Sequence, residues 1–162
     1  MELDTLLGLP AHALIVHAVV VLVPLAALGA IAVVLSPSLR ARYGSLVGAL
    51  SAVAVVLVPL ASGSGEQLEQ RVTETALVER HTAMGEQLLP FVAVMAVATL
   101  AVLVVDRVRA ARPQTAPRWA APWVATLAVV IAVATAAGSL VQVARIGHSG
   151  AKAVWHTTAS TR

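Results

Sequence analysis

The sequence contains no cysteine, and only 12% of its 162 residues are charged. The absence of cysteine excludes disulfides, thiolate zinc sites, cysteine-ligated iron–sulfur clusters and covalently attached c-type haem. The low charge is unusual, because a soluble domain carries about 25% charged residues. The hydrophobic residues, in contrast, make up 59% of the chain. This composition favours an integral membrane protein.

Several motifs of enzyme chemistry are also absent. The sequence has no Glu-x-x-His pair of a ferritin-like di-iron bundle and no His-Glu-x-x-His protease motif. It has no phosphate-binding loop, no dinucleotide fingerprint and no series of charged residues within an apolar stretch, as a proton pump would need. We therefore expect that the chain is not an enzyme on its own.

Four hydrophobic blocks are long enough to be membrane spans, since a helix crosses the hydrocarbon layer with about 20 apolar residues. They cover residues 13–35, 45–61, 88–105 and 123–143. The segments outside them are too short for an independent soluble domain. The sequence therefore predicts an all-α fold, an integral membrane four-helix bundle that forms a single domain over residues 1–162 within the lipid bilayer.

The charges between the blocks predict the orientation. Residues 36–44 contain two arginines and no acid, and residues 106–122 contain four arginines and one acid. Arginines in short loops mark the cytoplasmic side, so the basic character is a topology signal and no nucleic-acid partner is expected. The central loop has five glutamates and two arginines. We expect a cell-membrane protein with loops 36–44 and 106–122 in the cytoplasm and both termini outside.

The segment from Ser64 to Arg80 predicts a short amphipathic helix on the outer surface, between the second and third spans. Ser64 and Gln67 match a capping box. Apolar residues recur at four-residue spacing, at Leu68, Val72 and Ala76. The alternative is an irregular acidic loop.

Two features concern the relation between the two halves of the chain. Gly-Glu-Gln-Leu occurs at residues 65–68 and again at 85–88, which hints at two related helical hairpins. Pro90 can belong to the first turn of the third span, or it can kink a longer helix that begins near His81. The sequence leaves both alternatives open.

The histidines are the candidate site residues: His12, His17, His81, His148 and His156. In the predicted topology all of them lie at the outer membrane face or just inside it. A histidine in or beside a span is a functional-site hypothesis by default. His17 is the only ionisable residue well inside a hydrophobic block. We therefore expect it to point into the bundle and to approach one of the polar groups His81, His148, Glu66 and Glu86.

His17 can be a ligand to haem iron or another metal, or a structural residue that hydrogen-bonds Gln142 or a backbone carbonyl. His12 lies five residues earlier, about 140° around a helix, so both cannot point at one place unless the helix starts between them. The candidate haem ligands are His17, His81, His148 and His12. The candidate metal ligands are His17, His81, His148, Glu66 and Glu86. We expect His156, in the C-terminal tail, to be solvated.

The run from Leu9 to His17 resembles the opening signature of the four-span membrane proteins called domain of unknown function 2231. Members typically have His-Pro-x-x-x-His at the start of the first helix, and Ala13 replaces that proline here. Further blocks resemble the family at residues 61–66, 81–86, 147–151 and 154–155. Relatives sometimes carry a Rieske iron–sulfur domain, and the architecture is similar to four-helix b-type cytochromes. The resemblance therefore implies redox work at the membrane.

Two functions from different classes follow. One is a small redox subunit for electron transfer, with haem b or a transition metal held at the outer face by histidines from two helices. The other is a non-catalytic accessory subunit that braces a larger membrane complex or a homo-oligomer, for which its many small residues suit helix contacts. A carrier or channel is disfavoured because the spans lack charge.

Overall fold

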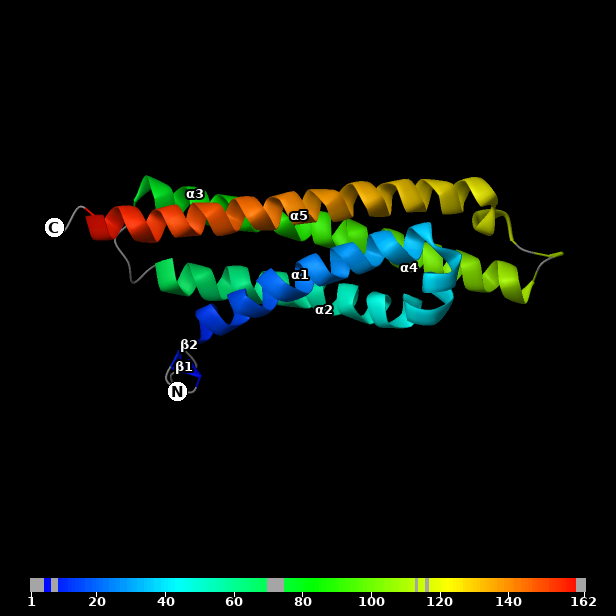
Figure 1. The fold of residues 1–162 in the computed structure, drawn as a ribbon, viewed down its shortest axis with the longest axis horizontal. Helices are drawn as coiled ribbons and strands as arrows, with labels where there is room; N and C mark the ends of the chain where they lie inside the picture. Colours follow the sequence, from blue (N-terminus) through cyan, green and yellow to red (C-terminus); the bar gives the residue numbers. More distant parts are fainter. Residues whose placement is uncertain (1–4, 7–8, 70–74, 113, 116, 160–162) are drawn as a thin grey trace.

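The computed structural model describes residues 5–6, 9–69, 75–112, 114–115 and 117–159, and its long helices form an elongated bundle (Figure 1). These are α1 (Ala11–Leu35), α2 (Pro37–Glu69), α4 (Leu88–Ala111) and α5 (Pro122–Ala159). The shorter elements are the strands β1 (Thr5–Leu6) and β2 (Leu9–Pro10), the helix α3 (Ala76–Glu86) and the 3-10 turn η1 (Arg118–Ala120).

Four stretches are long and apolar enough to cross a membrane: Leu14–Leu35, Pro37–Glu66, Val78–Ala111 and Pro122–Lys152. Helix α1 packs against α2 and α5, and α4 packs against the same two helices. The predicted all-α bundle of four membrane helices is confirmed. The second, third and fourth stretches are longer than their hydrophobic blocks. The second and fourth helices continue into their polar flanks, and the third stretch includes most of α3 as well as α4.

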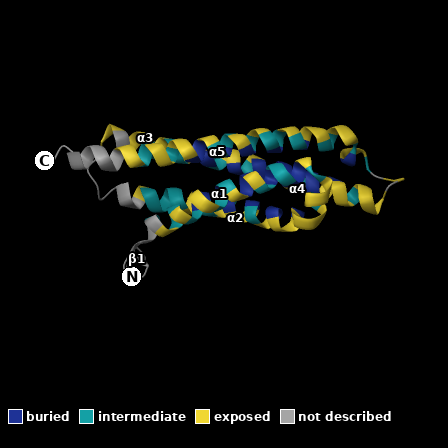
Figure 2. Ribbon diagram, viewed as in Figure 1, coloured by how far each residue is buried: buried dark blue, intermediate teal, exposed yellow. Residues whose placement is uncertain are grey.

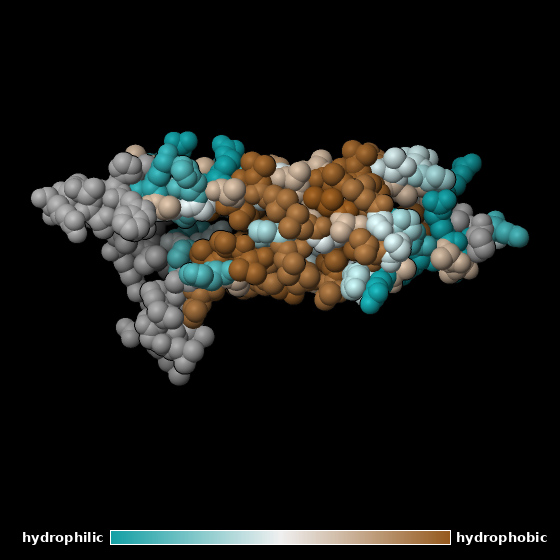
Figure 3. Space-filling model, in the orientation of Figure 1, coloured by the Kyte–Doolittle hydropathy of each residue, from teal (hydrophilic) through white to brown (hydrophobic). Residues whose placement is uncertain are grey.

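Alanines fill much of the interior of the bundle, together with valines and Met95, and many leucines and valines face outward. Ala26, Ala30, Ala54, Ala132 and Ala136 are fully buried, and the buried positions follow the inner faces of the helices (Figure 2). Figure 3 shows the outward-facing apolar side chains as a belt around the middle, with polar residues toward both ends. In water such a belt would mark an interaction site, and in a bilayer it is the lipid-facing surface.

Arg40 ties three helices together at the end of the bundle that we call the arginine end, which also carries Arg109 and Arg118. Its guanidinium donates to the carbonyl oxygens of Val33 (3.1 Å) and Val34 (3.2 Å), which lie in the last turn of α1. It also donates to Asp106 of α4 (3.3 Å). A cation at a helix C-terminus satisfies free carbonyl groups and interacts favourably with the helix dipole.

The predicted loop over residues 36–44 is mostly helical. Only Ser36 separates α1 from α2, and its hydroxyl accepts a hydrogen bond from the backbone N–H of Leu39 (3.4 Å). Pro37 is the first residue of α2, where its missing N–H has no helical partner to lose. The arginines of this segment therefore lie on the first turns of α2.

The predicted helix start at Ser64 is wrong. Helix α2 continues through Ser64, whose hydroxyl donates to the carbonyl of Ala61 (2.9 Å), as serines inside helices do. A separate helix, α3, begins at Ala76 and is capped by Thr75, whose hydroxyl accepts from the N–H of Val78 (3.3 Å). The predicted placement of the Leu68 and Val72 side chains lies outside the described part.

Pro90 explains why α3 and α4 are separate helices. A proline cannot donate to the carbonyl four residues earlier, and its ring clashes with that group. That residue is Glu86, where α3 ends, and Pro90 lies in the first turn of α4. The two copies of Gly-Glu-Gln-Leu therefore occupy different positions, one in the last turns of α2 and one across the α3–α4 junction.

Gln142 of α5 supports this junction from the interior. Its side chain is only 4% exposed. The amide donates to the carbonyl of Met84 (2.9 Å) and to the side-chain oxygen of Gln87 (3.4 Å). A helix interruption at membrane depth is tolerated where protein groups satisfy its backbone, and Gln142 does so here. The alternative in which Gln142 pairs with His17 stays a prediction.

Candidate functional site

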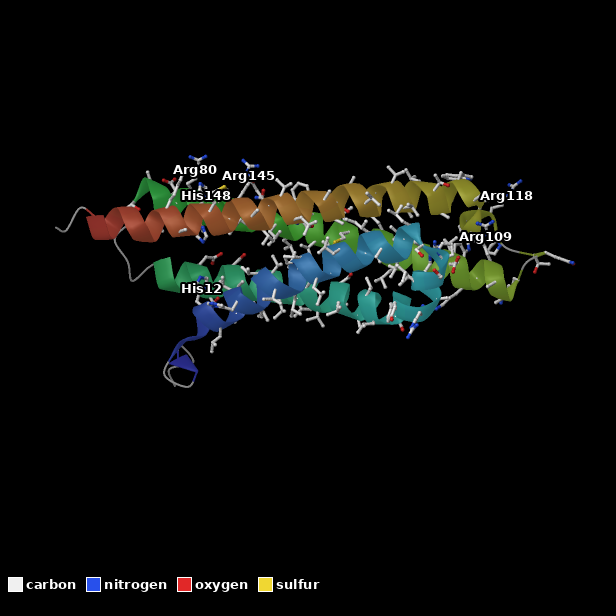
Figure 4. All side chains as sticks on the ribbon, viewed as in Figure 1. His12, Arg80, Arg109, Arg118, Arg145 and His148 are labelled. Carbon is white, nitrogen blue, oxygen red and sulfur yellow. The ribbon has the colours of Figure 1, made fainter. Side chains whose placement is uncertain are left out.

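The helix segments that carry the described histidines lie toward one end of the bundle, opposite the arginine end (Figure 1). We call this the histidine end. It is formed by the start of α1, the last turns of α2, all of α3 and the last turns of α5. The labelled residues in Figure 4 show the separation, with His12 and His148 at one end and Arg109 and Arg118 at the other.

His12, in the first turn of α1, is bonded to the end of α2. Its Nδ1 lies 3.0 Å from the hydroxyl of Ser64, and that hydroxyl donates to the carbonyl of Ala61. The imidazole is half-buried between the two helices. The contact thus joins α1 to α2 at the end of this helical hairpin that lies opposite the connecting residue Ser36.

His81, in α3, is bonded to α5 in the same way. Its Nδ1 lies 2.9 Å from the hydroxyl of Ser149, and that hydroxyl is 2.8 Å from the carbonyl of Ile146, to which it donates. This imidazole is also partly buried. Each half of the chain therefore contains the same unit, a histidine bonded to a serine that is itself bonded to a carbonyl three residues earlier.

The serine contacts restrict which ring nitrogen carries the proton. A hydroxyl has one hydrogen, which it can donate either to the carbonyl oxygen or to Nδ1 of the imidazole. Where the serine donates to the carbonyl, Nδ1 of the ring donates to the serine oxygen and Nε2 keeps a lone pair. That tautomer is the one in which a histidine could bind a metal through Nε2.

A glycine lies under each ring. A Cβ on Gly65 would lie 3.1 Å from Cε1 of His12, and a Cβ on Gly150 would lie 3.0 Å from Cε1 of His81. Such distances are shorter than an ordinary van der Waals contact, so any larger residue would displace the ring. Each serine is thus followed by the residue that makes room for the imidazole bound to it.

The surroundings of the His12 ring favour its neutral form. Burial of the ring lowers its pKa below the ordinary value of 6.5, a hydrogen bond with the backbone of Ala61 raises it, and the charge of His81 lowers it. Burial and the charge of His81 therefore both favour a neutral His12.

The other candidates lie elsewhere. His17 is exposed on α1 rather than turned into the bundle, because α1 begins at Ala11 and includes both histidines, and the 140° between them turns only His12 inward. His148 is exposed on α5, and Glu66 and Glu86 are exposed as well. His156 lies in α5, but its side chain is outside the described part. Among the described residues, no three His, Asp or Glu side chains gather closely enough to hold a metal ion.

Sequence reasoning missed the two serines and two glycines. The signal was the dipeptide Ser-Gly, at residues 64–65 and 149–150, but Ser64 was interpreted as a helix cap. Its partner lies 52 residues away in the sequence, so the pairing became visible only when α1 and α2 were packed together.

The comparisons with known proteins identify a family. A family model described as predicted membrane protein (DUF2231) matches residues 8–162. No curated protein and no solved structure matches the chain. The matched region contains both histidine–serine units.

Proposed function

Because the chain belongs to the DUF2231 family of predicted membrane proteins, a family defined by membrane character rather than by an activity, we propose that its function resides in the paired imidazoles of His12 and His81. The proposed role is a small multi-pass redox subunit. The pair would hold a haem b iron, or another transition-metal ion, at the histidine end and serve electron transfer.

The observation that carries this proposal is the orientation of the two rings by serine. Metal-bound histidines almost always donate their second nitrogen to an oxygen acceptor, which fixes the tautomer and the plane of the ring. His12 and His81 both have a serine hydroxyl at Nδ1, from Ser64 and Ser149, which would accept this hydrogen bond in the metal-binding tautomer. A purely structural contact would not need the same geometry in both halves.

The protonation state supports the same role. A histidine binds a metal only in its neutral form, so protons compete with the metal. The lowered pKa of His12 keeps its ring neutral at physiological pH. Two histidines from separate helices are also a sufficient protein ligand set for haem iron, which takes its other four ligands from the porphyrin. Zinc in a structural site would require four protein ligands.

A second candidate is the accessory subunit. The two histidine–serine contacts join α1 to α2 and α3 to α5, so they also act as clips at the open end of each hairpin. The small-residue interior favours close helix packing, as expected for a bracing protein. In this case the rings would need no ligand at Nε2, and other subunits or a second copy would contact the apolar belt.

Haem titration of the purified protein separates the two candidates. Addition of haem b to the wild-type chain in detergent should give a saturable change in the visible absorption spectrum. His12→Ala and His81→Ala should each weaken binding at least tenfold, since each removes one of the two imidazoles that would hold the iron. His148→Ala is the matched control and should bind like the wild type. A parallel dialysis against Cu²⁺ tests a simple metal ion. Equal binding by all four proteins, or no binding at all, would leave the accessory role.

A further inference from the structure

A cationic pocket lies between α3 and α5, on residues that the histidine pair does not use, apart from the shared Ser149. Four of its residues belong to one face of α5, at the helical spacing i, i+3, i+4 and i+7: Arg145, His148, Ser149 and Lys152. Arg80 and Met84, one turn apart on α3, complete it. The cavity volume is about 140 Å³, which is large enough for a small anion.

The pocket has positive charges and no negative one. Arg80, Arg145 and Lys152 all line it, and none of the three makes an ion pair with a described residue. The ion pair that the described part contains, Arg40 with Asp106, lies at the arginine end. Three cations converging on one cavity repel one another unless an anion occupies it. Figure 4 shows Arg80, Arg145 and His148 grouped at the surface of the histidine end.

The location of the pocket identifies a phosphate group as the suitable anion. The apolar stretch of α5 has 31 residues and ends at Lys152, which gives a length of about 46 Å at 1.5 Å per residue. That length exceeds the hydrocarbon thickness of about 30 Å and reaches the head-group region. Arginine forms paired hydrogen bonds with phosphate oxygens, and lysine adds a mobile point charge.

We infer that the pocket formed by Arg80, Arg145, His148 and Lys152 binds a phosphate group, either on the head group of an anionic phospholipid or on a soluble phosphate. This inference does not depend on the histidine pair, because it uses the outward faces of α3 and α5. The two sources share the same chemistry and differ only in whether the phosphate carries a lipid.

The experiment measures thermal stability of the full chain in lipid nanodiscs, in two arms. The lipid arm replaces increasing fractions of phosphatidylcholine by phosphatidylglycerol. The phosphate arm keeps pure phosphatidylcholine and adds inorganic phosphate. Wild-type protein should show a saturable rise of Tm in one of the arms, and that arm identifies the source. A charge near an anionic head group contributes about 1 kcal/mol, which corresponds to about fivefold in affinity.

The double variant R80Q/R145Q should therefore lose about 30-fold in apparent affinity in the responding arm. The matched control is R109Q/R118Q, which removes two exposed arginines from the arginine end and should respond like the wild type. If the double variant fails to fold, the single variant K152Q should show about a fivefold loss. The inference is overturned if neither arm stabilises the wild type, or if the control loses as much as the pocket variant.

Discussion

At the scale of single residues, two serine hydroxyl groups orient the paired histidines. Ser64 and Ser149 each lie within hydrogen-bond distance of a backbone carbonyl and of Nδ1 of the neighbouring imidazole. When the serine donates its proton to the carbonyl, the imidazole donates from Nδ1 and its Nε2 keeps an available lone pair.

The pH dependence of stability should report the environment of His12. Its folded-state pKa is lowered, so the unfolded chain binds a proton first as the pH falls below about 6.5. The contribution of His12 to stability is complete above that value and is lost as the pH falls through the folded-state pKa. The Tm of the metal-free wild type should therefore fall as the pH is lowered from about 7 to about 5.

His12→Gln should show a smaller loss over the same range. The measurement is Tm against pH in detergent for the two proteins. Identical pH profiles for His12→Gln and the wild type would contradict the burial of a neutral imidazole.

The glycines of the Ser-Gly pairs should behave differently from other glycines in the same helices. Gly65→Ala and Gly150→Ala place a methyl group about 3 Å from an imidazole carbon, so both should displace the ring and weaken haem or metal binding about tenfold. Gly63→Ala and Gly147→Ala meet nothing within 4 Å. These controls should keep binding and gain about 0.5–1 kcal/mol from helix propensity. If all four variants bind alike, the glycines do not position the rings.

The sequence allowed some of these residues to be selected and not others. His12 and His81 were candidates because they flank apolar blocks, and that is a local property. The choice of His12 over His17 depends on where α1 begins, and a shift of a few residues turns a different side chain inward. Hydrophobicity locates a span but does not locate its first turn.

At the scale of helices, the break between α3 and α4 is the least regular feature of the bundle. Pro90 removes the hydrogen bond to Glu86, and Gln142 of α5 supplies a donor to the carbonyl of Met84. The arrangement brings α3 against α5, which is where His81 meets Ser149 and where the cationic pocket forms. The helix break therefore positions both proposed sites.

Replacement of Gln142 by leucine should destabilise the protein by about 1–3 kcal/mol, because the carbonyl of Met84 would lose its side-chain partner in a buried location. Gln87→Ala is a suitable control, since its exposed side chain makes only the longer contact of 3.4 Å, and it should cost less than about 0.5 kcal/mol. The measurement is Tm or denaturant unfolding in detergent. A Gln142→Leu variant as stable as the wild type would mean that Gln142 does not support the break.

Helix lengths were only partly predictable. The four blocks identified the spans, but α2 extends from Pro37 to Glu69, well beyond residues 45–61. Serine, glycine and glutamate in its last turns lower the hydropathy without ending the helix. The short helix before the third span was predicted, whereas its start at Ala76 was not, because a capping box can also occur inside a helix that continues.

At the scale of the whole molecule, the chain consists of two halves with matching polar contacts at one end. The first half contributes His12 and Ser64, and the second contributes His81 and Ser149. The membrane architecture could be predicted directly from the sequence, because a belt of apolar side chains needs only hydrophobic blocks of sufficient length. The histidine–serine contact within each half could not, since these contacts join residues 52 and 68 positions apart.

The orientation remains a prediction, in which the arginine end faces the cytoplasm. Because the chain has no cysteine, single-cysteine variants can test it. Glu66→Cys at the histidine end should react with a membrane-impermeant maleimide in intact cells. Arg118→Cys at the arginine end should react only after permeabilisation. The reverse labelling pattern would place the histidine pair in the cytoplasm.

In the proposed site, one imidazole from each half of the chain binds the same metal. The central prediction is therefore a stoichiometry of one metal per chain. The most direct measurement is the haem iron or other transition-metal content per chain of protein purified from the membrane, for the wild type and three histidine variants. The account predicts one metal per chain in the wild type and in His148→Ala, and almost none in either His12→Ala or His81→Ala. One metal per chain in both His12→Ala and His81→Ala would contradict it.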